Sequence, residues 1–427
     1  MHARFLTYAV IWPLKVRIRW QPDQPDMSAI KSPSRSGHLV ILNQASNYLT
    51  VGFANAFNRR FDSVSLIAGS VHCQGEMLDS TIRVDKINHW RERPAWKKVS
   101  SYLIAMTRMW WLLMTRYRKH EVLFISVPPM AYLLNLVVPH RFSMVIWDIY
   151  PDTLKIGGMT EAQPIFRIWS WLNRKSFRKA YRLFTISEIM AEAMSKYVER
   201  HRILVQPIWS IFQNCSRIPR EENKFLSNFD FGGRFIVQYS GNIGLTHNVD
   251  LLVDIAEQLR DRKDILIQII GRGPREPYIR RLVADRGLDN LQMLPFQSDE
   301  MFPHSLSAAD LGVVMLDERV GRGSVPSKAY NLMALGIPSL YVAGSDSQLA
   351  QNAEKYQHAR CFRADRITEI TDWIRKLASN NEELEAMRRR AERAAKNYQR
   401  CNADRFVEMY MHTENEIADN CIGSVED

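Results

Sequence analysis

Residues 321–338 read GRGSVPSKAYNLMALGIP. The small residues of Gly321–Ser324 predict a flexible loop whose backbone can approach a ligand closely. Pro326 suits the first turn of a helix, so Ser327 and Lys328 would lie at its N-terminus, where free backbone amides favour an anion. A glycine and a proline then end the helix. Alone, the stretch fits an ordinary capped helix as well as a binding site, so the surrounding chain has to decide.

Short apolar runs alternate with helical patterns on both sides of this stretch. The alternation predicts the fold class α/β, with two doubly wound parallel-sheet (Rossmann-like) domains facing a cleft. Pro207–Gly233 has no strong periodicity and predicts a linker. The expected parts are a basic extension and linker at 1–37, a first domain at 38–210, a second at 230–396, and a C-terminal helix at 397–427 that returns to the first domain.

The charge of the 427-residue chain is unevenly distributed. Residues 1–220 hold 31 Lys and Arg against 14 Asp and Glu, a net +17, while the whole chain is +11. Ten of the 11 tryptophans also lie there. A basic, Trp-rich first half predicts an anionic partner, either a membrane or nucleic acid. The five scattered cysteines form no CxxC pair, which argues against a zinc site or a disulfide framework.

Three segments bear on a membrane. The apolar run within residues 1–20 is too short to span a bilayer, and we expect it to be either an interfacial anchor or an extension upstream of a working start at Met27. Val122–Pro139 carries no charge, but its Pro-Pro pair favours a strand, a turn and a helix over a membrane span. Glu92–His120 mixes tryptophans with basic residues, which suits a membrane interface or a helix with its aromatic residues in the core.

Three glycine-bearing turns follow predicted strands of the second domain: Ser240–Gly244, Gly271–Pro274 and Gly321–Ser324. The carboxyl ends of parallel strands meet at one edge of a sheet, so these turns should lie together. Their backbone amides and Lys328 would make a cradle for a diphosphate. No GxGxxG after the first strand, GxxxxGK[ST], HExxH or GxSxG motif offers an alternative.

These motifs carry a resemblance to a known family. Tyr239–Gly244, Gly271–Pro274, Leu294–Phe296, Ala308–Val314 and Val325–Pro338 resemble, in order and spacing, the donor-binding half of family 4 glycosyltransferases of the GT-B fold. The branch that builds bacterial surface polysaccharides is the most similar. The resemblance implies transfer of a sugar from a UDP- or GDP-linked donor, with retention, without a cofactor and without a metal.

The resemblance also implies roles for individual residues. Gly241, Asn242 and Gly244 would face the diphosphate and the reacting sugar. Gly271, Gly273 and Phe296 would line the nucleoside pocket, and Ser327 and Lys328 would hold the diphosphate. The family's two signature glutamates fall on Gly323 and Asn331 here, so both carboxylates are absent. Asn331 can still bind the ribose hydroxyls, without a charge.

Two polar residues outside these motifs are candidates for the reacting centre. Asp148 follows a buried strand, and we expect it to be the catalytic group of the first domain, the alternative being a turn or cap aspartate. His247 lies in the first glycine turn and is more simply an ordinary loop histidine.

Together these features predict a cytoplasmic glycosyltransferase, of the hexosyltransferase class, held peripherally at the inner face of the cell membrane. It would extend a lipid-linked saccharide for O-antigen, capsule or exopolysaccharide, with the basic first domain on the anionic leaflet. A nucleotide-sugar epimerase and a non-catalytic nucleotide-sugar-binding partner of the assembly machinery are alternatives. Nucleic-acid binding is disfavoured, because no recognised nucleic-acid module is present.

Overall fold

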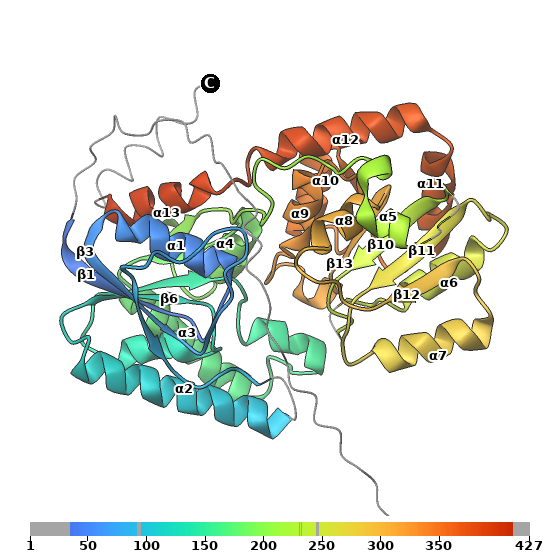
Figure 1. Ribbon diagram of the computed structural model, residues 1–427. Coiled ribbons are helices and arrows are strands. Elements are labelled where there is room, and N and C mark those ends of the chain that lie inside the picture. The colour runs from blue at the N-terminus through green and yellow to red at the C-terminus, as the bar shows by residue number, and fades with distance from the viewer. Residues whose placement is uncertain (1–34, 92–94, 230, 232, 245–246, 413–427) are drawn as a thin grey trace, which may run out of the picture. The chain divides into compact units, whose positions relative to one another are not determined.

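The buried apolar runs form two parallel sheets in the computed structural model (Figure 1), which describes residues 35–91, 95–229, 231, 233–244 and 247–412. The expectations for residues 1–34 and for the end of the chain beyond 412 lie outside these residues.

The first sheet has the strand order β5-β3-β1-β6-β7-β8-β9. The elements of this half are β1 (Arg35–Leu42), β2 (Ala45–Ser46), α1 (Tyr48–Asn58), β3 (Phe61–Ala68), β4 (Ser70–Val71), β5 (Arg83–Lys86), α2 (Ala95–Thr115), β6 (Glu121–Ile125), the 3-10 helix η1 (Ala131–Leu136), β7 (Phe142–Ile146), η2 (Asp152–Gly157), α3 (Pro164–Lys179), β8 (Leu183–Thr185), α4 (Glu188–Met194), η3 (Arg200–Arg202) and β9 (Ile203–Val205). The order changes direction between β1 and β6, as in other doubly wound sheets.

The second sheet has the order β12-β11-β10-β13-β14-β15. Its half of the chain contains η4 (Arg220–Glu222), α5 (Lys224–Asn228), β10 (Phe235–Ser240), α6 (Leu251–Gln258), β11 (Ile265–Ile270), α7 (Glu276–Arg286), β12 (Leu291–Leu294), α8 (Phe302–Ser307), β13 (Leu311–Met315), η5 (Glu318–Val320), α9 (Lys328–Ala334), β14 (Ser339–Val342), α10 (Gln348–Tyr356), β15 (Ala359–Phe362), α11 (Ile367–Ala378), α12 (Asn381–Ala395) and α13 (Cys401–Met411).

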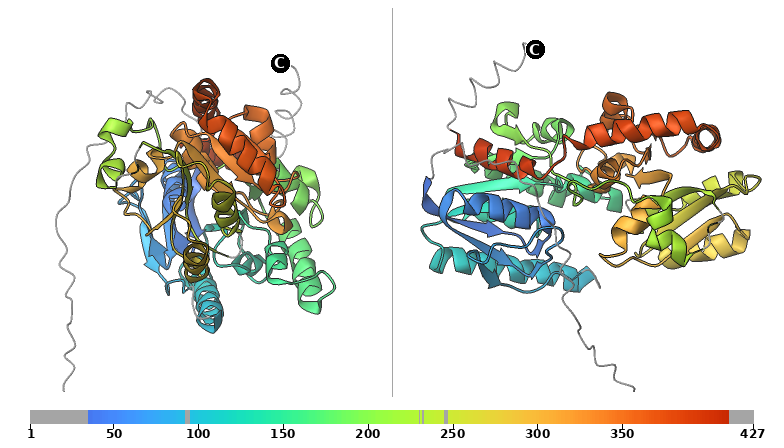
Figure 2. Two further views of the ribbon diagram at one scale, coloured as in Figure 1. Left: turned by 90° about the vertical axis from the view of Figure 1, so that its right-hand side faces the viewer. Right: turned by 45° about the horizontal axis from the view of Figure 1, so that its top comes forward.

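Each sheet is buried on both faces. In β13, Val313 packs with α6 and α11, whereas Val314 belongs to the cluster of α8, α9 and α10 on the other face, because successive side chains of a strand point to opposite sides. Helices α1 and α13 cover one face of the first sheet, and α2 and α3 cover the other (Figures 1 and 2). The predicted pair of doubly wound α/β sheets is therefore confirmed.

Helix α13 packs on the first half although it follows the second half in sequence. Phe406 contacts Phe53 and Phe57 of α1, with ring centroids 4.6 and 5.9 Å apart. Tyr410 adds an edge-on contact with Phe57 at 5.0 Å. The chain therefore crosses between the two sheets twice.

The uncharged run Val122–Pro139 forms β6 and η1, as its Pro-Pro pair indicates. Across the described part of the chain, we find no helix with the length and apolar character that crossing a membrane requires.

The segment Pro207–Gly233, expected to be a linker, connects the two sheets, and its later part packs on the second half of the chain. Phe225 is buried with Phe231 and Ile236 in one apolar cluster. Arg217 donates to the carbonyl oxygens of Ser307 and Ala309, at 2.9 and 2.8 Å. Such distant partners leave no periodic pattern in the local sequence.

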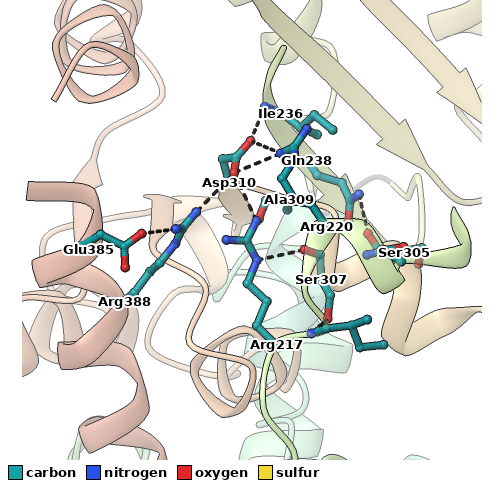
Figure 3. A network of polar contacts seen from close by, with 12 residues as sticks. Arg217, Arg220, Ile236, Gln238, Ser305, Ser307, Ala309, Asp310, Glu385 and Arg388 are labelled. Atoms are coloured by element: carbon teal, nitrogen blue, oxygen red, sulfur yellow. Dashed lines mark hydrogen bonds and ion pairs between the residues drawn. The ribbon is translucent and has the colours of Figure 1, made fainter. Parts of the chain in front are cut away.

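A buried carboxylate secures this segment (Figure 3). Asp310 accepts hydrogen bonds from Arg217, Arg220 and Arg388, at 3.1, 3.1 and 3.2 Å, and from the backbone amide of Ile236 at 3.0 Å. Arg217 lies in the crossing segment, the stretch between β9 and η4, whereas Arg220 belongs to η4 and Arg388 to α12. Asp310 therefore ties three parts of the chain to the amino ends of β10 and β13.

Candidate functional site

Two glycine turns lie side by side at the carboxyl ends of β10 and β11. The amide of Gly241 donates to the carbonyl of Ile270 at 2.9 Å, and the amide of Gly271 donates to Leu294 at 3.2 Å. Both glycines have positive φ angles, +151° and +155°, which side chains rarely adopt. The turns therefore continue the hydrogen bonding of the sheet and present bare backbone at its edge.

Gly273 and Gly244 flank the carboxamide of Asn242. A Cβ atom on Gly273 would lie 2.3 Å from the carbonyl oxygen of Ile243 and 2.8 Å from Oδ1 of Asn242. A Cβ atom on Gly244 would lie 2.9 Å from Nδ2 of Asn242. The structure thus brings these predicted donor-binding residues together.

Lys328 begins α9 and reaches the first of these turns. Its Nζ atom donates to the hydroxyl of Tyr239 at 3.0 Å and lies 4.3 Å from the centre of that ring. A Cβ atom on Gly241 would come within 2.5 Å of Nζ. Among the described residues, no ion pair to a carboxylate is found for this ammonium, and desolvation lowers its pKa to about 7. An anion at the turn would supply the missing counter-charge.

His247 lies beside the same tyrosine, with ring centroids 6.4 Å apart. Burial, with a smaller contribution from the charge of Lys328, lowers the pKa of His247 to about 3. The imidazole is therefore neutral at physiological pH, which leaves Lys328 as the group of this turn that a bound anion would hold in its charged form.

Asn331 and Lys328 line one small pocket of about 20 Å³. Oδ1 of Asn331 accepts hydrogen bonds from the hydroxyl of Ser210, at 2.9 Å, and from the amide of Ile211, at 3.2 Å. The carboxamide oxygen therefore holds the crossing segment. That Asn331 binds ribose stays a prediction, and its NH₂ group would have to make the contact, because its oxygen is already occupied.

The remaining second-half candidates lie at the same edge of the sheet. Phe296 follows β12 and is 57% exposed, and the guanidinium of Arg272 lies 5.2 Å from its ring centre. Ser327 precedes α9 and makes no side-chain cap bond. Phe296 thus offers a free aromatic surface beside the glycine turns, suited to stacking on a base.

Asp148 contacts the loop that opens the 321–338 stretch. Its backbone forms an antiparallel bridge with Ser324, and the next amide, that of Ile149, donates to the carbonyl of Gly323 at 3.1 Å. Desolvation raises the pKa of the Asp148 carboxyl, and a hydrogen bond with the Ser324 side chain opposes this rise. The expectation of a flexible loop is therefore wrong at Gly323 and Ser324, because contacts with the first half hold them.

The sequence did not predict the contacts of three residues of this region. Tyr239 and Ser324 were visible only as parts of motifs, and Ser324 and Ser210 interact with partners more than 100 positions away. We find no group of three or more His, Cys, Asp or Glu side chains arranged to hold a metal ion in the part of the chain that the structure describes.

In a comparison with known protein families, residues 220–394 match the family model "Glycosyl transferases group 1". The chain is 25% identical over 226 residues to the putative colanic acid biosynthesis glycosyl transferase WcaI of Escherichia coli K12, covering 52% of this chain and 55% of that protein. It is 23% identical over 249 residues to the probable glycosyltransferase WbjE of Pseudomonas aeruginosa, covering 56% and 61%. The matches thus span little more than half of each relative.

Solved structures show the fold of the larger part of the chain. WaaG, a glycosyltransferase involved in lipopolysaccharide biosynthesis, superposes with a TM-score of 0.66 at 13% identity, over 88% of this chain and all of WaaG. HepE of Anabaena, in complex with UDP and glucose, also gives 0.66, at 11% identity over 88% and 99% of the two chains. The expected GT-B fold is therefore confirmed.

Proposed function

We propose that this protein is a glycosyltransferase that moves a sugar from a nucleotide-sugar to a lipid-linked saccharide in surface polysaccharide biosynthesis. The observation that carries the proposal is Lys328, an ammonium that has no carboxylate ion pair among the described residues and that points at the turn of Gly241. The match of residues 220–394 and the names of the relatives support the same reaction class.

Charge stabilisation is the main task of such a site, because breaking the bond between sugar and phosphate leaves a negatively charged diphosphate. The amides of the Gly241 turn and the ammonium of Lys328 would face that charge, with Ser327 beside them. Phe296, Gly271 and Gly273 would line the nucleoside pocket. A retaining, metal-independent reaction with Asp148 near the reacting centre completes this proposal.

The first half carries a candidate membrane surface on α2 and α3. Trp96, Leu103 and Trp111 on α2 are 67%, 59% and 61% exposed. The alternative, in which the aromatic residues of this helix lie in the core, is therefore wrong for Trp96 and Trp111. On α3, Ile168 and Trp171 are 58% and 50% exposed. Apolar side chains that protrude from a basic half suit the interface of an anionic membrane.

Basic side chains accompany these aromatic residues. Nζ of Lys97 lies 5.3 Å from the ring centre of Trp96, and Nζ of Lys175 lies 3.9 Å from that of Trp171. Both helices pack against η1, so their exposed stripes belong to one face of the first sheet. We propose that this face rests on the inner leaflet and positions the protein near a lipid-linked acceptor.

A nucleotide-binding measurement tests the proposed function. Thermal unfolding of the full chain would be followed with UDP, GDP and their sugars. A ligand at 100 times its Kd stabilises a protein by about 2.7 kcal/mol, which such a measurement detects. We expect stabilisation by one nucleotide family, lost in Lys328→Met and kept in Lys263→Met, an exposed lysine on the same half. Stabilisation by none of the nucleotides would refute the proposal.

A non-catalytic nucleotide-sugar binder remains the second candidate, because Gly323 and Asn331 replace the family's carboxylates. It would show the same stabilisation but no transfer of radiolabelled sugar to a lipid extract from a polysaccharide-producing bacterium.

A further inference from the structure

A cavity of about 700 Å³ lies beside α10 and is also lined by Tyr330 of α9. Its walls are the residues that follow β8 and β9, one side of α10, and the chain from Asn397 to Arg405 that leads into α13. None of the proposed donor-binding residues lines it. Its volume lies within the roughly 300–1,000 Å³ typical of small-molecule sites.

Carboxamides dominate the polar lining of this cavity. Six of them contribute: Gln206, Gln348, Gln351, Asn352, Asn397 and Asn402. The charged side chains are two acidic and two basic ones, Glu188, Glu354, Lys355 and Arg405, so the lining has no net charge. The chemistry therefore differs from that around Lys328, and it favours a neutral, hydroxyl-rich ligand over a phosphate.

One pair of carboxamides is only half satisfied. Nε2 of Gln348 donates to Oδ1 of Asn352 at 3.0 Å, and the hydroxyl of Tyr398 approaches the same oxygen at 3.3 Å. Oε1 of Gln348 and Nδ2 of Asn352 are buried and have no hydrogen-bond partner among the described residues. Asn352 as a whole is only 2% exposed. Both residues line the cavity, and a hydroxyl group can satisfy either an unpaired acceptor or an unpaired donor, because it both donates and accepts.

Aromatic rings form another part of the wall. Tyr398 stacks on Tyr330 with centroids 4.1 Å apart, and Tyr356 meets Tyr398 edge-on at 6.3 Å. Tyr356 is only partly buried. Aromatic faces pack against the C–H faces of sugar rings, while carboxamides bind their hydroxyl groups.

We infer that this cavity binds a neutral oligosaccharide, of about the size of a di- or trisaccharide. The site lies between elements of both halves, at the place where the chain crosses from α12 to α13. A sugar chain held there would bridge α10 and the carboxyl ends of β8 and β9. The inference goes beyond the proposed function, since it requires neither nucleotide binding nor turnover.

Calorimetry and saturation-transfer NMR on the full chain test the inference, with maltotriose, cellotriose and chitotriose as probes. We expect saturable binding of at least one trisaccharide, which saturating UDP does not displace. Gln348→Ala and Tyr356→Ala should each weaken binding at least tenfold. Gln163→Ala and Tyr278→Ala, which change exposed residues of the same types outside the cavity, should leave the affinity as it is.

Three results would overturn the inference. The first is no saturable binding of any of the three trisaccharides. The second is binding that survives both cavity substitutions. The third is binding that UDP displaces or that Lys328→Met abolishes, which would place the sugar at the nucleotide site instead. Nucleotide stabilisation is measured separately in the same variants, so a failure here and a failure of the proposed function are distinguished.

Discussion

A Cβ atom on Gly271 would lie 1.9 Å from the carbonyl oxygen of Gly241. The obstacle is backbone, so no side-chain rotation can relieve it. The backbone of Gly271 also has a φ of +155°, which adds strain for any other residue. The two turns can therefore lie this close only while position 271 has no side chain.

Gly271→Ala should accordingly cost about 3 kcal/mol of the free energy of unfolding, from overpacking together with backbone strain. It should also weaken nucleotide binding, because the Gly241 turn has to move. Urea unfolding measures the first effect. Gly157→Ala is the control, since a Cβ atom there meets nothing within 4 Å. Equal stability of the two variants would contradict the predicted contact.

Lys328 gives the stability of the unliganded protein a defined pH dependence. The pKa of its ammonium is about 7 in the folded chain, whereas an unperturbed lysine has a pKa of about 10.4. Between these values the unfolded chain holds a proton that the folded chain lacks, so the free energy of unfolding rises with pH. Below pH 7 both states are protonated, and this dependence disappears.

Urea unfolding at several pH values between 6 and 10 measures this effect as the difference between wild type and Lys328→Met. We expect the wild-type protein to gain stability relative to the variant as the pH rises from about 7 toward 10. Lys263→Met should follow the wild-type profile. Parallel profiles for wild type and Lys328→Met would show that the ammonium is not desolvated.

Asp148 and Ser324 should act together in turnover. Asp148→Asn should lower kcat by about 100-fold or more if the carboxyl acts at the reacting centre, and should leave nucleotide stabilisation intact. Ser324→Ala removes the hydrogen bond that lowers the pKa of Asp148. The acidic limb of the pH–kcat profile should therefore move to higher pH. Ser345→Ala, an exposed serine, is the control; a limb that stays in place in Ser324→Ala would refute the coupling.

Much of the architecture could be predicted from local patterns. The strands Ile265–Ile270, Leu311–Met315 and Ser339–Val342 are each an apolar run between turn residues, which is the pattern that predicts a buried strand. The adjacency of Gly241 and Gly271 followed from the rule that parallel strands end at one edge.

Contacts between distant segments could not be predicted. Asn331 and Ser210 are 121 positions apart, and the backbone pairing of Ser324 with Asp148 joins the two halves. Neither contact leaves a periodic signal in its own segment. For this reason the local pattern predicts a flexible loop at 321–324 and a linker around Phe225.

The exposed stripe of α2 should govern membrane binding. Replacing Trp96, Leu103 and Trp111 together by serine should reduce cosedimentation with anionic phosphatidylglycerol vesicles at least tenfold, because the apolar contact is lost while the charge is kept. Tyr278→Ser, which removes a 51% exposed aromatic residue from α7, should bind vesicles like the wild type. The membrane surface would be refuted if the wild type, the triple serine variant and Tyr278→Ser bound vesicles equally. It would also be refuted if the wild type showed no preference for anionic over neutral vesicles at low salt.

Asp310 should be among the most sensitive positions for stability. Asp310→Ala leaves Arg217, Arg220 and Arg388 without their shared carboxylate and leaves the amide of Ile236 unpaired, in a buried place (Figure 3). Removing one partner of a buried ion pair costs about 3–5 kcal/mol, because the remaining charge is uncompensated. Denaturant unfolding should show a loss of this size.

The matched control is Asp289→Ala, which breaks the pair with Lys263 at the surface, where both side chains are 66% exposed. Its unfolding midpoint should stay at the wild-type value, because solvent screens exposed pairs. Replacing Arg388 by methionine in the Asp310→Ala background should restore part of the lost stability, since it removes one of the stranded charges. The loss of unfolding free energy caused by Arg388→Met would be compared in the wild-type and the Asp310→Ala backgrounds. An equal loss in both would show that the network acts through packing rather than through charge.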